Sequence, residues 1–206
     1  MESVLLIDIT IRKMVAADLP SVVNVHQKAF KGFFLEKMGP RFLLCYYQAV
    51  LNYNNSFAFV AVDEKDGLLG FTTGFRNPDQ FYVYFRKVRH RLLPAIALAV
   101  VRNPSLIRDI IRNSRRVSNT INSDAMNVEL SSIASSASGK GIGKALLNKF
   151  CSEAFGGGAR MIELKTDEME NNKVRRFYEM AGFKIMGTEQ RRGRTLSIYQ
   201  LSNAKV

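Results

Sequence analysis

Hydrophobic and polar positions follow several distinct spacings along the chain, and each spacing predicts its own kind of element. Residues 9–14 (ITIRKM) alternate apolar and polar side chains, as a half-buried strand does. Residues 16–30 and 39–55 repeat apolar side chains at helical intervals, and Asp18 is a candidate cap of the first helix. Residues 56–75 carry two apolar runs around an Asp-Gly pair, the pattern of a β-hairpin.

The second half of the chain begins with a helical, basic segment at residues 81–116 and then alternates strands with helices. The later elements are predicted as strands at 127–135 and 161–167, helices at 141–155 and 171–182, and a hairpin at 183–202. This order predicts a single α/β domain over residues 1–206, with a mixed sheet flanked by helices. A helical insertion, at about residues 78–123, is expected between the third and fourth strands.

The net charge of the chain is unusual, and most of it lies in the insertion. The formal net charge is +12, although 47% hydrophobic and 23% charged residues are ordinary for a soluble globular protein. Residues 85–116 hold nine Lys and Arg side chains and a single acid. Such a segment favours an anionic partner, such as nucleic acid, a phosphorylated ligand or a membrane surface, without choosing among them.

Three features favour a cytoplasmic protein. Cys45 and Cys151 fit no metal or redox spacing and are expected to be buried free thiols of a reducing compartment. The apolar run near the N-terminus lacks the basic segment that opens a signal peptide. The longest apolar run, residues 92–101, is shorter than the roughly 20 residues that a membrane-spanning helix needs.

Residues 135–147 (SSASGKGIGKALL) place three glycines and two lysines where a helix is predicted to begin. Glycines let a ligand approach the backbone, and the first N–H groups of a helix have no internal acceptor. With the positive end of the helix dipole and the two lysines, they form a candidate site for phosphate. The spacing matches neither the Walker loop nor the dinucleotide-binding fingerprint. A flexible helix start without a ligand is the alternative.

A second segment, residues 171–183 (NNKVRRFYEMAGF), follows one strand later, and the two segments together resemble the GNAT superfamily of acyl-CoA-dependent N-acetyltransferases. Gly141 and Gly143 match the pattern Q/R-x-x-G-x-G/A at the start of that family's third helix. The second segment is similar to the pattern N-x-x-A-x-x-F/L-Y-x-x-x-G-F of the fourth helix, through Asn171, Phe177, Tyr178, Gly182 and Phe183.

The resemblance covers nearly the whole chain, because the order of elements is also the family's. It has two departures, since the family's Gln/Arg and Ala positions are Ser138 and Val174 here. Ser138 lacks the long side chain that the family places near the phosphates, and Lys140 is a candidate to replace it.

The resemblance implies acetyl-CoA as co-substrate, no metal, and a sheet that splays between its fourth and fifth strands. In the family the pantetheine arm lies in that gap and pairs with the fourth strand, where a backbone N–H polarises the thioester carbonyl. The cofactor-binding set implied for this chain is Ile133, Ala134, Ser135, Gly139, Lys140, Gly141, Ile142, Gly143, Lys144, Asn171 and Phe177.

Acetyl transfer to an amine needs a base, because most amines are protonated at pH 7. Glu129 is a carboxylate in an otherwise neutral strand, and family members often place a glutamate there; a solvent-facing strand residue is the alternative. Asp124 is a second candidate for the base. Tyr178 matches the family's general acid, which protonates the departing thiolate, and a core tyrosine is the alternative.

The insertion allows three interpretations. It caps the active site with its basic side toward an anionic acceptor, which makes Arg108 and Arg112 acceptor-binding residues; it lies on a membrane surface; or it forms a dimer contact or a helix pair of the core, with its basic residues solvated. The first is preferred, because the run at 92–101 is too apolar to remain exposed on a soluble monomer. Binding of nucleic acid is not expected.

The acceptor is expected to be a small molecule with a primary amine. The stretch GFF-L-x-x-x-G-x-x-FL at residues 32–43, with the basic insertion, is similar to bacterial GNAT members found with surface-polysaccharide genes. That similarity implies an amino sugar linked to a nucleotide or a lipid. Protein N-termini, lysine side chains and polyamines are alternatives, as is a non-catalytic module of this fold that binds membrane or nucleic acid.

Overall fold

The computed structural model describes residues 9–88, 93–104, 106, 126–136, 140–168, 172–191 and 194–203. Seven strands of this part form one sheet in the order β1-β2-β3-β4-β5-β7-β6. Neighbouring strands are antiparallel except β4 and β5, which are parallel, so the predicted mixed sheet is confirmed. The strands are β1 (Thr10–Lys13), β2 (Ser56–Val62), β3 (Leu68–Arg76), β4 (Asn127–Ser135), β5 (Met161–Asp167), β6 (Lys184–Arg191) and β7 (Arg194–Ser202).

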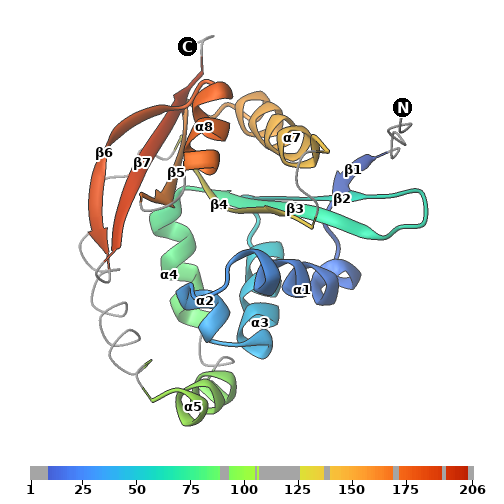
Figure 1. Ribbon diagram of the computed structural model, residues 1–206, viewed down its shortest axis with the longest axis vertical. Helices are drawn as coiled ribbons and strands as arrows, with labels where there is room; N and C mark the ends of the chain where they lie inside the picture. The colour runs from blue at the N-terminus through green and yellow to red at the C-terminus, as the bar shows by residue number, and fades with distance from the viewer. Residues whose placement is uncertain are drawn as a thin grey trace.

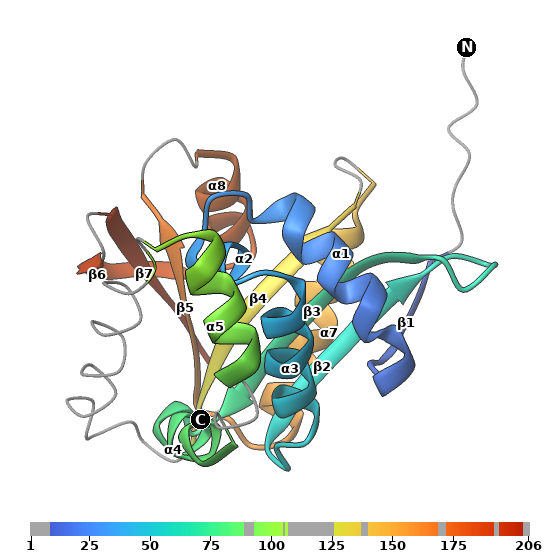
Figure 2. The same cartoon turned by 90° about the horizontal axis from the view of Figure 1, so that it is seen from below.

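Helices cover both faces of the sheet (Figures 1 and 2). In Figure 1, α7 and α8 lie above β3 and β4, and α1 to α5 lie below them. The helices are α1 (Leu19–Ala29), α2 (Phe34–Lys37), α3 (Pro40–Leu51), α4 (Pro78–Val88), α5 (Leu93–Arg102), α7 (Ile142–Gly156) and α8 (Asn172–Met180), with a 3₁₀ turn at Ala16–Asp18. The α/β architecture with helices on both faces of a mixed sheet, expected from the order of elements, is therefore present.

Alternation along β3 explains why the molecule has two cores. Phe71 and Phe75 are fully buried against the side of the sheet that carries α1, α3 and α4. Gly70 points to the other side, where an added Cβ would lie 3.1 Å from side-chain atoms of both Ile142 and Leu146. Because successive residues of a strand face opposite sides, the glycine positions let α7 pack closely on the sheet.

The sheet splays between β4 and β5, as the resemblance implied. These two strands pair at Asn127 with Met161, at Val128 with Ile162 and at Glu129 with Glu163, and at no residue beyond. Both strands continue after the last pair, and β5 pairs with β7 along its whole length. A gap therefore opens between the carboxyl halves of β4 and β5, with the Glu129–Glu163 pair at its apex.

A bulge lies in β4 just beyond the apex. Thr73 of β3 pairs with Ser132, and the next residue of β3, Gly74, pairs with Leu130. Ser131 is thus an extra residue in β4. A bulge of this kind bends the strand and turns two successive side chains toward the same face.

Helices α4 and α5 follow β3 and agree with a helical insertion at this point. The expectation that the insertion buries its apolar run is wrong for α5. Ala99 is buried, but Leu93 and Val101 remain 60% and 78% exposed. The helix packs one side on α3, and Leu93 and Val101 lie on the other. No helix among the described residues is long and apolar enough to cross a bilayer.

Two smaller expectations change in detail. The carboxylate of Asp18 does not cap α1; it accepts hydrogen bonds from Arg12 and from the backbone N–H of Val15. Cys45 and Cys151 are free thiols in α3 and α7, but both are only partly buried. Burial still raises the pKa of the Cys151 thiol to about 12.

Candidate active site

The apex of the gap carries two carboxylates side by side. Glu129 of β4 and Glu163 of β5 are paired in register, so their side chains leave the same face of the sheet. Their neighbours Val128 and Ile162 are buried against α7 on the opposite face. Glu129 and Glu163 therefore face the side that carries α1 to α4. The Glu163 carboxylate lies 3.8 Å from Nζ of Lys165 and accepts a hydrogen bond from the Gln200 amide.

Tyr82 of α4 contacts the candidate base directly. Its hydroxyl donates a hydrogen bond of 2.9 Å to Oε1 of Glu129. The ring of Tyr82 packs edge-on against Phe75 and Phe81, and these two rings stack with their centroids 3.7 Å apart. The first helix of the insertion is therefore part of the site, and it holds one oxygen of the Glu129 carboxylate in a fixed position.

Two tyrosines of α3 hold the bulge of β4. The hydroxyls of Tyr46 and Ser131 lie 2.8 Å apart, and Tyr47 is hydrogen-bonded to Ser132. Burial raises the pKa of the Tyr46 hydroxyl, which remains protonated at every physiological pH. Because both serines turn to the same side, α3 fixes the strand at the position where the gap begins.

His26 extends this buried polar group toward α1. Its Nδ1 lies 2.6 Å from the Tyr47 hydroxyl, and burial lowers the pKa of the imidazole to about 4. Within the described residues, Nε2 of His26 and Oγ1 of Thr73 are buried without a hydrogen-bond partner. His26 stays neutral at pH 7 and acts as part of the packing.

The start of α7 has the features of an anion site. Gly141 occupies the cap position with a φ of 73°, and no side chain among the described residues caps the helix. An added Cβ at Gly141 would meet nothing within 4 Å, and one at Gly143 would lie 3.7 Å from the ring of Phe177. Lys140 and Lys144 are exposed beside these free N–H groups. Uncapped N–H groups, open space and two cations are the requirements of an anion site.

Ile142 contributes to this site only through its backbone. Its side chain is 1% exposed and belongs to the core between α7 and the sheet. The Phe177 ring of α8 lies beside Gly143 of α7.

The part of β4 that borders the gap is available for pairing with an extended ligand. Ile133, Ala134 and Ser135 pair with β3 on one side, and β5 has separated from them on the other. Ile133 packs toward α7 and Ala134 toward α1 and α3, so neither side chain blocks the strand edge. This edge suits a pantetheine arm, which carries amide groups that can pair like a strand.

Tyr178 lies in the core on the α7 side of the gap. The residue is 6% exposed and packs on Phe177, Phe183 and Tyr199. It belongs to the same hydrophobic cluster as Leu130 of β4. Burial raises the pKa of its hydroxyl, which has no hydrogen-bond partner among the described residues. A protonated phenol with a free donor is suited to protonating a leaving group.

Arg194 of β7 joins the loop between α1 and α2 to the open end of the gap. Its guanidinium lies 3.3 Å from the carboxylate of Asp167, the last residue of β5, and donates to the carbonyl of Gly32. It also lies over the ring of Phe33, 4.7 Å from its centroid. The α1–α2 loop is thereby held beside β5 and β7, on the face where Glu129 and Glu163 lie.

Several expected site residues lie outside the described part of the chain: Gly139, Asn171, Arg108, Arg112 and the second candidate base Asp124. Sequence reasoning missed Tyr82, Glu163 and Arg194. The sequence could have predicted Glu163, because residues 127–130 (NVEL) and 161–164 (MIEL) share a pattern. Two such strands in parallel register pair their glutamates.

Comparisons with known proteins agree with this geometry. Residues 117–183 match the family model "Acetyltransferase (GNAT) family". The spermidine/spermine N-acetyltransferase SpeG of Vibrio cholerae superposes with a TM-score of 0.59 at 18% identity, over 96% of this chain and 95% of its own. A search of curated protein sequences found no significant match.

Two further structures share the fold. The YncA protein of Salmonella typhimurium, solved with its cofactor acetyl-CoA, has a TM-score of 0.61 at 15% identity, over 94% of this chain and 93% of its own. The ribosomal-protein-S18-alanine N-acetyltransferase of Escherichia coli has a TM-score of 0.60 at 14% identity, over 95% of this chain and 94% of its own. Residues 117–183 thus match the GNAT acetyltransferase family model, and the described chain shares the fold of these three acetyltransferase structures.

Proposed function

We propose that the protein transfers an acetyl group from acetyl-CoA to a primary amine by direct attack in a ternary complex, with Glu129 as base and Tyr178 as acid. The observation that carries the proposal is the position of Glu129 at the last pair before β4 and β5 separate. The carboxylate thus stands where an extended ligand in the gap would end. The acceptor approaches from the face that carries α1 to α4, and the cofactor from the side of α7.

The chain's own groups account for both proton transfers. Acetyl-CoA supplies an activated acetyl thioester when bound. Glu129 and Glu163 attract the protonated amine, and Glu129 removes one proton, directly or through water. Tyr82 orients the carboxylate through its 2.9 Å hydrogen bond. Tyr178 donates its phenolic proton to the departing sulfur and regains a proton from the amine nitrogen of the intermediate, directly or through water, so the products are a neutral amide and free coenzyme A.

The proposed cofactor contacts follow from the same arrangement. Backbone N–H groups of Gly141, Ile142 and Gly143, with Lys140 and Lys144, bind the phosphates. The backbone of residues 133–135 pairs with the pantetheine arm, and Phe177 packs beside it. The bulge of β4, which Tyr46 fixes at Ser131, keeps backbone donors near the thioester.

For the acceptor we propose an amino sugar that carries an anionic group, such as a nucleotide-linked or lipid-linked amino sugar. The glutamate pair suits its amine. The +12 charge of the chain and the basic insertion suit a phosphate and disfavour a polycation such as a polyamine. The fold alone does not identify the acceptor. SpeG and the ribosomal-protein enzyme share this fold, and their acceptors are as different as spermidine and a protein alanine.

Steady-state kinetics with labelled acetyl-CoA test both the proposed reaction and the proposed acceptor. A nucleoside-diphosphate amino sugar should give a kcat/KM at least roughly tenfold above spermidine and a peptide with a free N-terminus, because it alone satisfies both charged regions. A preference for spermidine or the peptide overturns the acceptor and leaves the reaction intact. Binding of acetyl-CoA with no transfer to any amine in a broad panel overturns the reaction.

A further inference from the structure

The outer side of α5 is an exposed aliphatic stripe. Leu93 and Val101 are eight residues apart on one side of the helix, about 12 Å along its axis, and Ala97 lies between them and is also exposed. The inner side packs through Ala99 and Ile96 on the core beneath α3. Figures 1 and 2 show that α5 stands at the edge of the molecule, farther from the sheet than α3.

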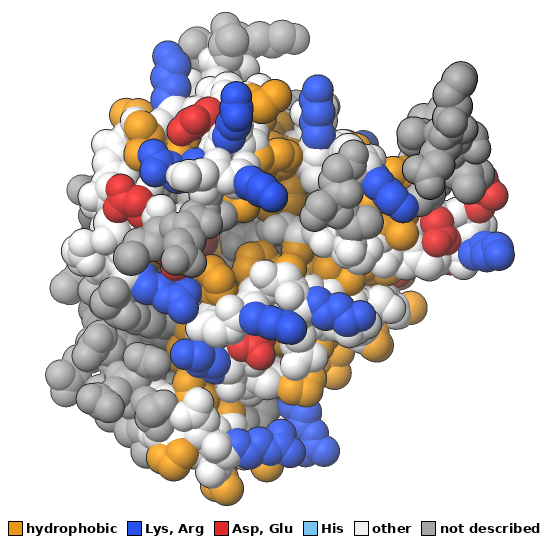
Figure 3. Space-filling model, in the orientation of Figure 1, with side chains coloured by type: hydrophobic (Ala, Val, Ile, Leu, Met, Phe, Trp, Pro, Cys, Tyr) orange, Lys and Arg blue, Asp and Glu red, His pale blue; other side chains and the backbone are white. Residues whose placement is uncertain are grey.

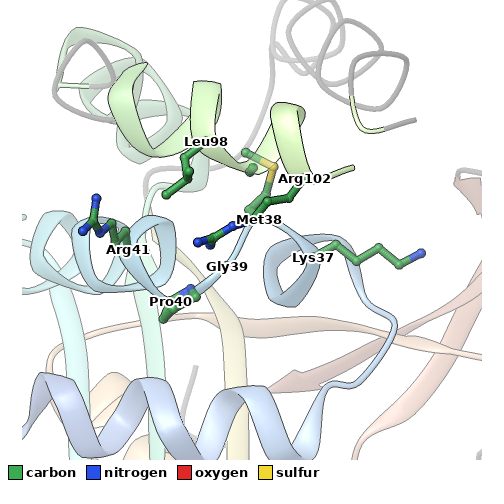
Figure 4. Close-up of a pocket in the computed structure, with 8 residues that line it drawn as sticks. Lys37, Met38, Gly39, Pro40, Arg41, Leu98 and Arg102 are labelled. Atoms are coloured by element: carbon green, nitrogen blue, oxygen red, sulfur yellow. The ribbon is translucent and has the colours of Figure 1, made fainter. Parts of the chain in front are cut away.

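Three basic side chains lie beside α5, at a cavity next to its inner side. A cavity of about 240 Å³ lies between α5 and the junction of α2 with α3, and its lining includes Lys37, Arg41 and Arg102 but no acid. Figure 4 shows Leu98 and Arg102 of α5 on one side of the cavity, while Lys37 and Arg41 extend outward from the other. The space-filling view shows hydrophobic and basic side chains together along the lower edge, where α5 lies (Figure 3).

The nearest acid on α2 is turned elsewhere. Glu36 accepts a hydrogen bond from the backbone N–H of Gly32, which directs its carboxylate toward the α1–α2 loop. The sequence adds further cations on both sides of α5, since residues 85–116 hold nine Lys and Arg and a single acid. The described charged side chains that line the cavity beside α5 are therefore all basic.

Of the surfaces that could cover this stripe, an anionic lipid bilayer matches both of its properties. A second copy of the chain would bring two positive patches together, and like charges oppose that contact. A nucleic acid would satisfy the cations but would leave Leu93 and Val101 in water. A bilayer accepts aliphatic side chains below its headgroups and attracts Lys and Arg to its anionic lipids.

We propose that the α5 face, formed by Leu93, Ala97 and Val101 with Lys37, Arg41 and Arg102, docks the enzyme on an anionic membrane surface. The helix lies parallel to the bilayer plane with the aliphatic stripe inserted, and the three cations contact lipid phosphates at its border. This contact is peripheral and independent of the transfer reaction.

Co-sedimentation with vesicles tests the proposal. The wild-type protein should bind vesicles of phosphatidylcholine mixed with phosphatidylglycerol. It should bind vesicles of phosphatidylcholine alone far more weakly, and added salt should weaken its binding to the anionic vesicles. Replacement of Leu93 and Val101 by Ser should weaken binding roughly tenfold or more. Replacement of Lys37, Arg41 and Arg102 by Gln should weaken it roughly fivefold for each charge removed.

Two control variants separate this face from the general charge of the chain. Met186→Ser removes an exposed side chain from β6, and a second control replaces three exposed lysines elsewhere, Lys13, Lys65 and Lys184, by Gln. Both controls should bind the anionic vesicles within about twofold of wild type. Circular dichroism melting should show the same midpoint for every variant that is compared.

Four outcomes overturn the proposal. The first is a wild-type protein that does not bind anionic vesicles. The second is undiminished binding by the Leu93→Ser, Val101→Ser variant, which would mean attraction by charge alone. The third is an equal loss of binding in the three-lysine control. The fourth is a lipid-free dimer, seen by analytical ultracentrifugation, that the Leu93→Ser, Val101→Ser change dissociates, which would assign the stripe to a second copy.

Discussion

The hydroxyl of Tyr82 donates a 2.9 Å hydrogen bond to Glu129, across 47 residues of sequence, and so joins the helical insertion to the strand at the apex of the gap. The insertion is therefore part of the proposed catalytic apparatus as well as a charged surface. A hydrogen bond to a carboxylate stabilises its ionised form and fixes its direction.

Tyr82→Phe should lower kcat roughly ten- to a hundredfold, because it deletes this bond and keeps the ring that packs on Phe75 and Phe81. The acidic limb of the kcat/KM profile should also move to higher pH. Tyr84→Phe is the matched control, since Tyr84 lies in the same helix and packs on Tyr53. Equal rates and profiles in the two variants would make Tyr82 a packing residue.

Tyr178→Phe should reduce kcat roughly ten- to a thousandfold with little change in acetyl-CoA affinity, because the phenol acts only on the leaving group. Its stability should hardly change, since the hydroxyl has no partner among the described residues. Tyr199→Phe should behave in the opposite way. The Tyr199 hydroxyl is hydrogen-bonded to Glu179 and Arg175, so its loss should lower the stability of the fold and leave kcat unchanged. Wild-type turnover by Tyr178→Phe would remove it as the acid.

Substitutions of the two glycines at the start of α7 should have different effects, one on stability and the other on cofactor binding. Gly141→Ala forces a side chain into left-handed backbone and should cost about 1–2 kcal/mol in the free energy of unfolding. Gly143→Val should leave the fold intact, because its Cβ meets only the Phe177 ring at 3.7 Å, but should abolish acetyl-CoA binding in calorimetry. Gly156→Ala, at the far end of α7 with nothing within 4 Å, is the control and should bind normally. Unchanged affinity in Gly143→Val would exclude the phosphate site.

Hydrophobic spacing predicted the order of elements well. In each helix or strand the apolar side chains recur at the helical or the alternating interval often enough to identify the element. Residues 127–135 alternate between buried and partly exposed side chains, as their sequence pattern predicted. The splayed gap and the acid–base pair came from the resemblance of two short segments, since spacing alone does not tell which strands separate.

Contacts between distant segments could not be predicted from spacing. Tyr82 reaches Glu129, and Arg194 reaches Gly32 across 162 residues, through the packing angles of α4 and β7. The exposure of α5 was missed for a related reason. A wholly apolar helix indicates burial, but the sequence does not show that α3 covers only one of its sides.

His26 should make stability depend on pH. Its pKa is about 4 in the folded chain and near 6.5 when unfolded, so the unfolded chain binds more protons between these values. The contribution is complete above pH 6.5 and is lost as the pH falls toward 4. Urea titrations should therefore show wild type losing roughly 2 kcal/mol more than His26→Gln between pH 7 and pH 5. An identical pH dependence in wild type and His26→Gln would contradict this account.

The pH dependence of turnover by Glu129→Gln is the most direct test of the central claim, that the carboxylate at the apex of the gap is the base of an acetyl transfer. We expect kcat/KM to fall roughly 10²- to 10⁴-fold at neutral pH and to recover partly as the pH rises, because the acceptor amine then loses its proton without help. Glu163→Gln is the matched control and should raise the acceptor KM while kcat stays within about threefold of wild type. A loss in Glu129→Gln that is the same at every pH, or no loss at all, would contradict the account.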